Sequence, residues 1–182
     1  MKKSVLALSI IVASLSTSAI ARDGVYVSGA YSMMYQDAII SATNDVENGY
    51  AVAAGYDFPM GSFFVLGAEV EYKNLGSTTE TVLSDSLKVS MSSYGVNILP
   101  KIYLGDSFHV MAKLGFHKIE ADLTSTYPMP ASLTTASDTA SLLGFGLGYD
   151  FTENVAVQTT YEIHNIAGYN TASANVGLKY TF

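Results

Sequence analysis

Residues 144–182 read GFGLGYDFTENVAVQTTYEIHNIAGYNTASANVGLKYTF, and this C-terminal stretch decides the fold. From Ala172 through Leu178 and Tyr180 to Phe182, every second residue is apolar or aromatic, whereas the residues between them are small or polar. Such alternation is typical of a β-strand with one apolar and one polar face, because successive side chains point to opposite faces. In a soluble sandwich the apolar face would pack on a second sheet, whereas in a membrane barrel it would meet lipid.

The N-terminus has the features of a secretory signal peptide. Two lysines follow Met1, residues 5–15 are mostly apolar, and Ala19-Ile20-Ala21 offers a cleavage site of the small-x-small type. An uncleaved membrane anchor is the alternative, but serines interrupt the apolar run, which is short for a spanning helix. We therefore expect a signal peptide over residues 1–21 and a single mature domain over residues 22–182.

The composition limits the partners of this domain. Without the two lysines of the signal, seven basic residues face 16 acidic ones, a net charge of −9. This charge argues against a nucleic-acid partner, which requires a basic surface. The chain has no cysteine, so disulfides and thiolate metal sites are excluded. We expect no cofactor, no metal site and no catalytic residue.

The alternating pattern recurs in seven earlier segments of the chain. The expected strands lie at about 24–36, 50–58, 64–73, 87–104, 108–117, 143–151, 155–164 and 172–182. Long polar loops at about 37–47, 76–86 and 120–138 alternate with tight turns, and a medium loop lies at about 167–170. This arrangement predicts an all-β fold: an eight-stranded antiparallel up-and-down transmembrane β-barrel with long extracellular loops and short periplasmic turns.

The fourth expected strand is the least regular. Its apolar residues change phase near Ser92-Ser93, which indicates either a β-bulge or the point where the strand leaves the membrane. Pro100 lies inside the same strand, where it cannot donate a ladder hydrogen bond. We expect a second bulge at Pro100.

Aromatic residues gather at both ends of the apolar phases, as in the aromatic girdles of membrane barrels. The expected lower ring consists of Phe58, Phe64, Phe108, Tyr149, Phe151, Tyr180 and Phe182. The expected upper ring consists of Tyr35, Tyr50, Tyr72, Tyr94, Phe116 and Tyr161. Both rings favour a membrane barrel over a soluble sandwich.

The opposite faces of the strands carry charges, which a closed barrel would bury. Three acids and three bases are expected to point inward: Glu69, Glu71, Lys101, Lys113, Glu162 and Lys179. Buried charges require partners, and a balanced set supplies them. We expect an interior ion-pair network. The alternative is that strand tilt separates the groups and that each is hydrated in a small cavity.

The stretch GFGLGYDFTENVAVQTTYE at residues 144–162, the terminal GLKYTF and the opening GVYVSGAYS resemble the small eight-stranded outer-membrane barrels. This superfamily includes the OmpA transmembrane domain and OmpX-, Ail- and opacity-type proteins. The resemblance implies that Leu178, Tyr180 and Phe182 are read by the barrel-assembly machinery. The chain departs from the family in having no tryptophan, and we expect no peptidoglycan-binding domain after Phe182.

These observations predict a non-enzymatic, monomeric integral protein of the outer membrane of a Gram-negative bacterium. Its lumen is filled by side chains. Its expected partners are outer-membrane lipid and lipopolysaccharide, the assembly machinery and a surface ligand of the loops, so its role is structural or adhesive. One alternative is a lipid-modifying enzyme, but His109, His117 and His164 all have inward phase. The other alternative is a narrow channel for small solutes.

Overall fold

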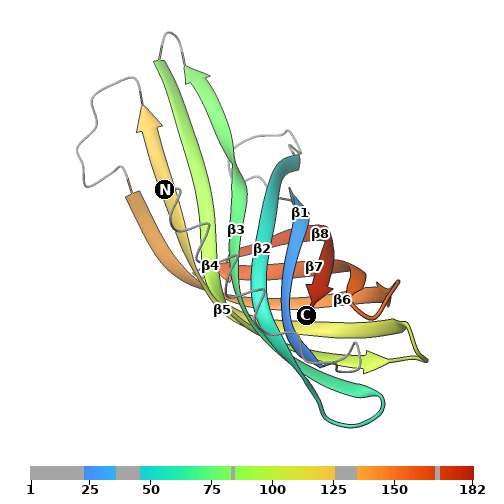
Figure 1. The fold of residues 1–182 in the computed structure, drawn as a ribbon. Coiled ribbons are helices and arrows are strands. Elements are labelled where there is room, and N and C mark those ends of the chain that lie inside the picture. Colours follow the sequence, from blue (N-terminus) through green and yellow to red (C-terminus); the bar gives the residue numbers. More distant parts are fainter. Residues whose placement is uncertain (1–22, 36–45, 83–84, 126–134, 167–168) are drawn as a thin grey trace, which may run out of the picture.

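The structure, a computed structural model, describes residues 23–35, 46–82, 85–125, 135–166 and 169–182; the expected signal peptide therefore lies outside the described residues. Eight antiparallel strands close into a barrel, with β1 paired to β8 (Figure 1). The strands are β1 (Gly24–Tyr35), β2 (Val46–Pro59), β3 (Phe64–Val82), β4 (Asp85–Tyr103), β5 (Phe108–Ser125), β6 (Thr135–Asp150), β7 (Val155–Ile166) and β8 (Tyr169–Thr181). The predicted eight-stranded barrel is confirmed.

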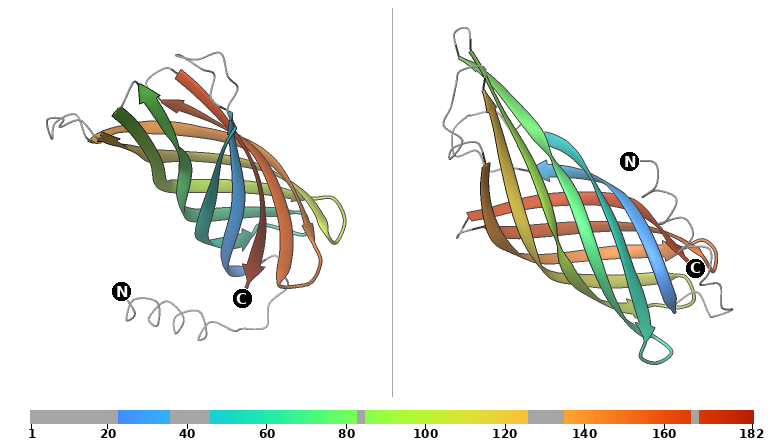
Figure 2. Two further views of the ribbon diagram at one scale, coloured as in Figure 1. Left: turned by 90° about the horizontal axis from the view of Figure 1, so that it is seen from above. Right: turned by 60° about the vertical axis from the view of Figure 1, so that its left-hand side comes forward.

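The strands are staggered around the barrel, which can be followed through the residues that lie opposite one another. The pairs that start at Phe64 on β3 lead through Ile102, Val110, Leu147, Thr159, Val176, Tyr31 and Tyr50 to Asn74. One circuit therefore ends ten residues further along β3, at Asn74 instead of Phe64. Such a stagger requires the strands to tilt against the barrel axis, as Figure 2 shows.

The alternation distributes the side chains as predicted, with apolar groups outside and charged groups inside. Outward Val70, Phe116 and Leu178 are 59%, 67% and 60% exposed. Inward Lys101 and Glu162 are each 1% exposed. Because the apolar faces point away from the closed interior, they do not pack on a second sheet. The sandwich alternative is therefore wrong.

Two of the expected loops are largely strand. β3 and β4 remain paired up to Val82 and Asp85, and β5 and β6 remain paired up to Asp122 and Thr135. The polarity of these segments suggested loops, but their serines and threonines are compatible with strands, and threonine favours them. The sheet of β3, β4, β5 and β6 consequently extends beyond the other strands at one end of the barrel (Figures 1 and 2). We call the part of this sheet that projects beyond the other strands the extension.

The irregularities of β4 differ from those expected. The register of β4 against β5 is the same at Leu87 and at Lys101, so β4 has no bulge at Ser92-Ser93 or at Pro100. The bulge lies in β3 instead, where Leu75 and Gly76 together oppose Met91. The missing amide hydrogen of Pro100 interrupts the pairing with β5 locally without shifting it. The phase change near Ser92 reflects a switch of face, because Met91 packs in the interior whereas Tyr94 and Val96 face outward.

Tight turns at the other end connect β2 to β3, β4 to β5 and β6 to β7, as predicted. Each is closed by a backbone hydrogen bond, for example from Leu104 N to Phe108 O at 2.8 Å. Gly105 has a φ of 94°, which a residue with a side chain rarely adopts. The C-terminus lies at this end as well, because Phe182 N donates to Val25 O at 3.0 Å and Thr181 N donates to Asn154 O at 2.8 Å.

Candidate functional site inside the barrel

The charged side chains of the interior form two clusters. The lower cluster, nearer the tight turns, is built around Asp57 of β2. Lys101 Nζ contacts both Asp57 oxygens at 2.8 Å, and Lys179 forms an ion pair with the same carboxylate. Both ammonium groups lie over the ring of Tyr26, at 5.1 and 4.5 Å from its centroid. Cations in such positions are attracted by the electron-rich face of the ring.

The central cluster is built around Lys113 of β5. Its ammonium group contacts Glu71 at 2.7 Å, Glu69 at 3.1 Å and Glu162 at 3.3 Å. Lys73 forms a second ion pair with Glu162 and lies 3.8 Å from Glu71. Three carboxylates from β3 and β7 thus share two ammonium groups, and all five side chains are at least nine-tenths buried.

Neutral groups complete the hydrogen bonding of these carboxylates. Asn97 Nδ2 donates to Glu69 and to Glu71, at 3.0 Å in each case. Tyr26 donates its hydroxyl hydrogen to Glu69 at 2.8 Å and thereby links the central cluster to the lower one. Thr160 donates to Glu162 at 2.9 Å. The carboxylates therefore have the partners that buried charges require.

All six charged residues expected in the interior lie there, but sequence reasoning missed two further members. Asp57 and Lys73 raise the set to four acids and four bases. Both have the inward phase of their strands, and this signal was available in the sequence. Both residues lie near strand ends, where the pattern does not show which cluster a side chain reaches.

The three histidines lie inside the barrel, and none of them faces outward. His117 hydrogen-bonds Ser93 through Nδ1 and Asn97 through Nε2, both at 2.8 Å. Its ring meets that of His164 edge-on, with the centroids 6.0 Å apart. His109 lies at the lower end, 3.5 Å from Asp150. These positions provide no histidine at the outer face, where a lipid-modifying enzyme would need one.

An apolar cluster lies at the upper end of the interior, next to the extension. Met34, Leu75, Ile119 and Ala140 are each at most 5% exposed, and Met91 packs against them. Sequence reasoning also missed this cluster, although the inward phase of Met91 was visible. We call these five residues the apolar plug.

Some space remains beside the ion pairs. A cavity of about 50 Å³ is bounded by Lys113, Glu162 and Asn175 on one side. Small residues of β1 and β2, including Ala30 and Ala51, form part of the other wall. The Oδ1 atom of Asn175 is buried without a hydrogen-bond partner from the protein. A cavity of this size and polarity has room for a few water molecules.

The outer surface carries the two expected groups of aromatic residues. In the upper ring, the aromatic ring centroids of Tyr50 and Tyr72 are 6.3 Å apart, and both side chains are exposed. The side chain of Tyr35 is not among those that the structure describes. In the lower ring, the ring centroids of Tyr180 and Phe182 are 4.9 Å apart. Leu178 and Tyr180 of the expected assembly signal are 60% and 45% exposed, so both face outward on β8.

Just above the upper ring, Lys118 and Glu120 of β5 form an exposed ion pair at 2.8 Å. Tyr94 donates its hydroxyl hydrogen to the same carboxylate at 3.1 Å. The hydrogen bond to Glu120 raises the pKa of Lys118 to about 12, and the bond from Lys118 lowers the pKa of Glu120. Both groups are therefore charged at neutral pH.

In the described part of the chain, no set of three or more histidine or acidic side chains is placed to hold a metal ion. No helix within the same residues is long and apolar enough to cross a membrane.

Comparison with protein families identifies the family of the chain. The family model "Outer membrane protein beta-barrel domain" matches residues 4–182. The chain belongs to this family. This match confirms the resemblance drawn from the sequence. The protein is therefore an outer-membrane barrel, and its location is the outer membrane. Comparison with curated protein sequences gives no significant match.

Solved structures of other outer-membrane barrels are similar to this one. Ail of Yersinia pestis, in complex with the heparin analogue sucrose octasulfate, has a TM-score of 0.63 at 17% identity, covering 88% of this chain and 97% of Ail. Neisserial surface protein A gives 0.58 at 13% identity, covering 87% and 97%. The N-terminal barrel of Pseudomonas aeruginosa OprF gives 0.55 at 14% identity, covering 88% and 99%. At these identities the likeness concerns the fold alone.

Proposed function

We propose that this outer-membrane barrel is a non-enzymatic surface protein with a closed lumen, whose role depends on its outer surface and its extension. The proposal rests on one observation, that side chains fill the interior of the barrel. The two ionic clusters fill its lower and central parts, and the apolar plug lies above them. An interior of this kind anchors the fold and leaves no wide pore.

The proposed orientation follows from the two ends of the barrel. The tight turns and the described C-terminus would lie in the periplasm, and the extension would lie outside the cell. Export would use the signal peptide, which would be cleaved after Ala21. The outward side chains of Leu178, Tyr180 and Phe182 would serve as the signal for the barrel-assembly machinery. The folded barrel would function as a monomer.

The extension supports a role in envelope integrity or in contact with a host or the environment. It places polar strands on the side that we assign to the exterior, where recognition by loops and strand tips takes place. The Ail structure contains a polyanionic heparin analogue. A partner of that kind fits this chain poorly, because the net charge of the mature domain is −9. We therefore expect a neutral or basic surface ligand.

Planar-bilayer recording of the purified protein tests the closed lumen. We expect no stable conductance from wild-type protein that migrates faster on SDS gels unheated than boiled. Open-channel currents from such folded protein would refute the proposal. Mass spectrometry of lipid A from cells with and without the protein tests the absence of enzymatic activity, since any altered lipid species would contradict it.

A narrow channel for small solutes is the second candidate, and the interior cavity of about 50 Å³ favours it. In this case the ion pairs would separate short water-filled spaces, and replacing Lys113 or Glu162 by alanine would open a current. A fully packed interior would instead lose thermal stability without gaining conductance. The same recordings, made on these two variants, distinguish the two candidates.

A further inference from the structure

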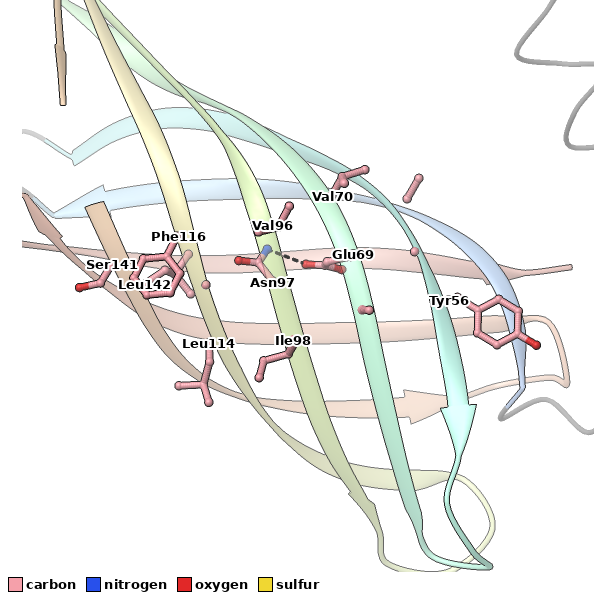
Figure 3. Close-up of a pocket in the computed structure, with 14 residues that line it drawn as sticks. Tyr56, Glu69, Val70, Val96, Asn97, Ile98, Leu114, Phe116, Ser141 and Leu142 are labelled. Atoms are coloured by element: carbon pink, nitrogen blue, oxygen red, sulfur yellow. Dashed lines mark hydrogen bonds between the residues drawn. The ribbon is translucent and has the colours of Figure 1, made fainter. Parts of the chain in front are cut away.

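A large groove lies on the outer face of the barrel. Its volume is about 820 Å³, within the range of ligand-binding clefts, and Figure 3 shows the residues that line it. The pairing of the strands explains its course. One wall is the row Tyr56, Ala68, Ile98 and Leu114, and the other is the row Ala54, Val70, Val96, Phe116 and Ser141.

Small side chains leave space in the lower part of the groove. Ala54 and Ala68 are outward residues of β2 and β3, between larger neighbours such as Tyr56 and Val70. Because rows of opposed residues rise around the barrel from β2 to β6, the groove rises toward the extension. Its upper end lies at Phe116, which is 67% exposed, and at Ser141. The outward side chains along this course are apolar up to Ser141.

A positive charge stands directly above this upper end. Lys118 follows Phe116 by two residues on β5, so the two side chains share the outer face. Tyr94, Lys118 and Thr139 form the next row of opposed residues above Val96, Phe116 and Ser141. The side chain of Lys118 is 46% exposed, and the other lysines with described side chains are all buried in the interior. Lys118 is thus the exposed base of the described surface.

An apolar groove that ends below a lysine has the chemistry of a phosphorylated lipid. The groove is continuous with the lipid-facing band of the barrel, which an acyl chain reaches from the membrane. Lys118 can form a charge-assisted hydrogen bond with a phosphate, and Tyr94 and Thr139 add hydroxyl groups beside it. In the orientation proposed above, this end lies in the outer leaflet, which consists of lipopolysaccharide.

We propose that the groove and Lys118 together bind one lipopolysaccharide molecule, with an acyl chain between the two rows and a lipid A phosphate at Lys118. The assignment rests on the proposed function through the orientation of the barrel. Glu120 already pairs with Lys118 and lies in the next row above, so it competes with the phosphate and limits the affinity.

Native mass spectrometry of the full-length mature protein in detergent, titrated with lipid A, tests the site. Ala68→Phe fills the groove and Lys118→Gln removes the charge. We expect Lys118→Gln to weaken binding of lipid A about tenfold, the loss of one charged hydrogen bond. Lipid A without phosphates should bind the wild-type protein as weakly as lipid A binds Lys118→Gln. The substitution Lys118→Gln should not weaken the binding of the phosphate-free lipid any further. Ala68→Phe should weaken both lipids.

Two variants sharpen the result. Ala172→Leu enlarges an outward residue that does not line the groove, and it should bind lipid A like the wild type. Glu120→Gln removes the competing carboxylate and should strengthen binding. Weaker binding by Glu120→Gln would overturn the pairing with Lys118, because it would mean that the carboxylate holds the phosphate through a cation. All four variants change outward side chains, and the heat-dependent gel shift verifies that each is folded.

Three outcomes would overturn the proposal. Binding by Ala68→Phe or Lys118→Gln that equals the wild type would exclude the groove or the lysine. Equal binding of phosphatidylglycerol and lipid A would show a general phospholipid site. A protein dimer that Ala68→Phe abolishes would assign the groove to a second copy of the chain. None of these outcomes bears on the closed lumen, which the conductance measurement tests separately.

Discussion

At the scale of single residues, Lys113 has more carboxylate partners than any other lysine of the described interior, because three carboxylates surround its ammonium group. In Lys113→Met, Lys73 would be the one remaining ammonium group of the central cluster for these three carboxylates. We expect the free energy of unfolding to fall by about 3–5 kcal/mol, the usual cost of an uncompensated buried charge. Urea titration in detergent, followed by the gel shift, measures this loss.

The matched control is Lys118→Met on the same strand. Lys118 pairs with one carboxylate in solvent, where screening leaves an ion pair little net effect. Its removal should not change the urea midpoint measurably. Equal losses in the two variants would show that the interior charges are hydrated separately, which is the alternative considered from the sequence.

Two glycines allow a second prediction at this scale. A Cβ atom on Gly95 would overlap the carbonyl oxygen of Phe116 and the ring of His117, whereas a Cβ atom on Gly29 would meet no atom within 4 Å. Gly95→Ala should therefore cost about 1–3 kcal/mol of stability, as overpacking does. Gly29→Ala should leave the unfolding temperature unchanged or raise it slightly. A loss in Gly29→Ala as large as that in Gly95→Ala would contradict the assignment of the two faces.

The face of each residue was predictable from the sequence, but the contacts across the barrel were not. Alternation placed Glu71 and Glu162 inside because it depends on neighbours along one strand. The meeting of Lys73 with Glu162 joins β3 to β7 and depends on the ten-residue stagger between strands. The sequence pattern contains no measure of that stagger. The partners of Asp57 and Lys73 could not be predicted for this reason, although the inward phase of both residues was visible.

At the scale of elements, the strand ends differ most from expectation. Polarity marked residues 76–86 as a loop, but polarity shows where lipid ends and does not show where backbone pairing ends. β3 and β4 stay paired above the apolar band. The apolar plug has a similar origin, since its inward apolar residues lie where the outward faces become polar. The sequence recorded this exchange as a phase change near Ser92.

The bulge at Leu75 and Gly76 marks the boundary between barrel and extension. Replacing residues 78–89 with Asn-Gly would join the paired residues Ser77 and Ser90 by a two-residue hairpin turn. The ionic clusters and the plug lie below the cut. We therefore expect the gel shift to persist and the free energy of unfolding to stay within about 0.5 kcal/mol of the wild type.

Leu75→Ala is the comparison for this shortened protein. Leu75 is 2% exposed within the plug, so its truncation should cost about 2–5 kcal/mol. If shortening the hairpin costs as much as Leu75→Ala, the extension belongs to the folding core. In that case its proposed role as a separate surface element would fail.

At the scale of the whole molecule, the proposed function has the lumen closed by two barriers of different chemistry in series. The ionic clusters block the centre through Coulomb attraction and hydrogen bonds. The apolar plug blocks the upper end by excluding water, as hydrophobic constrictions do in channels. Under this proposal either barrier alone would prevent conduction, so we expect a variant that disrupts only one to remain closed.

This arrangement predicts a synergy between two substitutions. Leu75→Ser wets the plug and Lys113→Ala loosens the central cluster, and each single variant should be silent in planar bilayers. The double variant should conduct, because water and ions then meet neither barrier. Current from Lys113→Ala alone would show that the plug does not seal the barrel, and it would favour the narrow-channel function. A silent double variant with an intact gel shift would show that the lower cluster around Asp57 closes the lumen by itself.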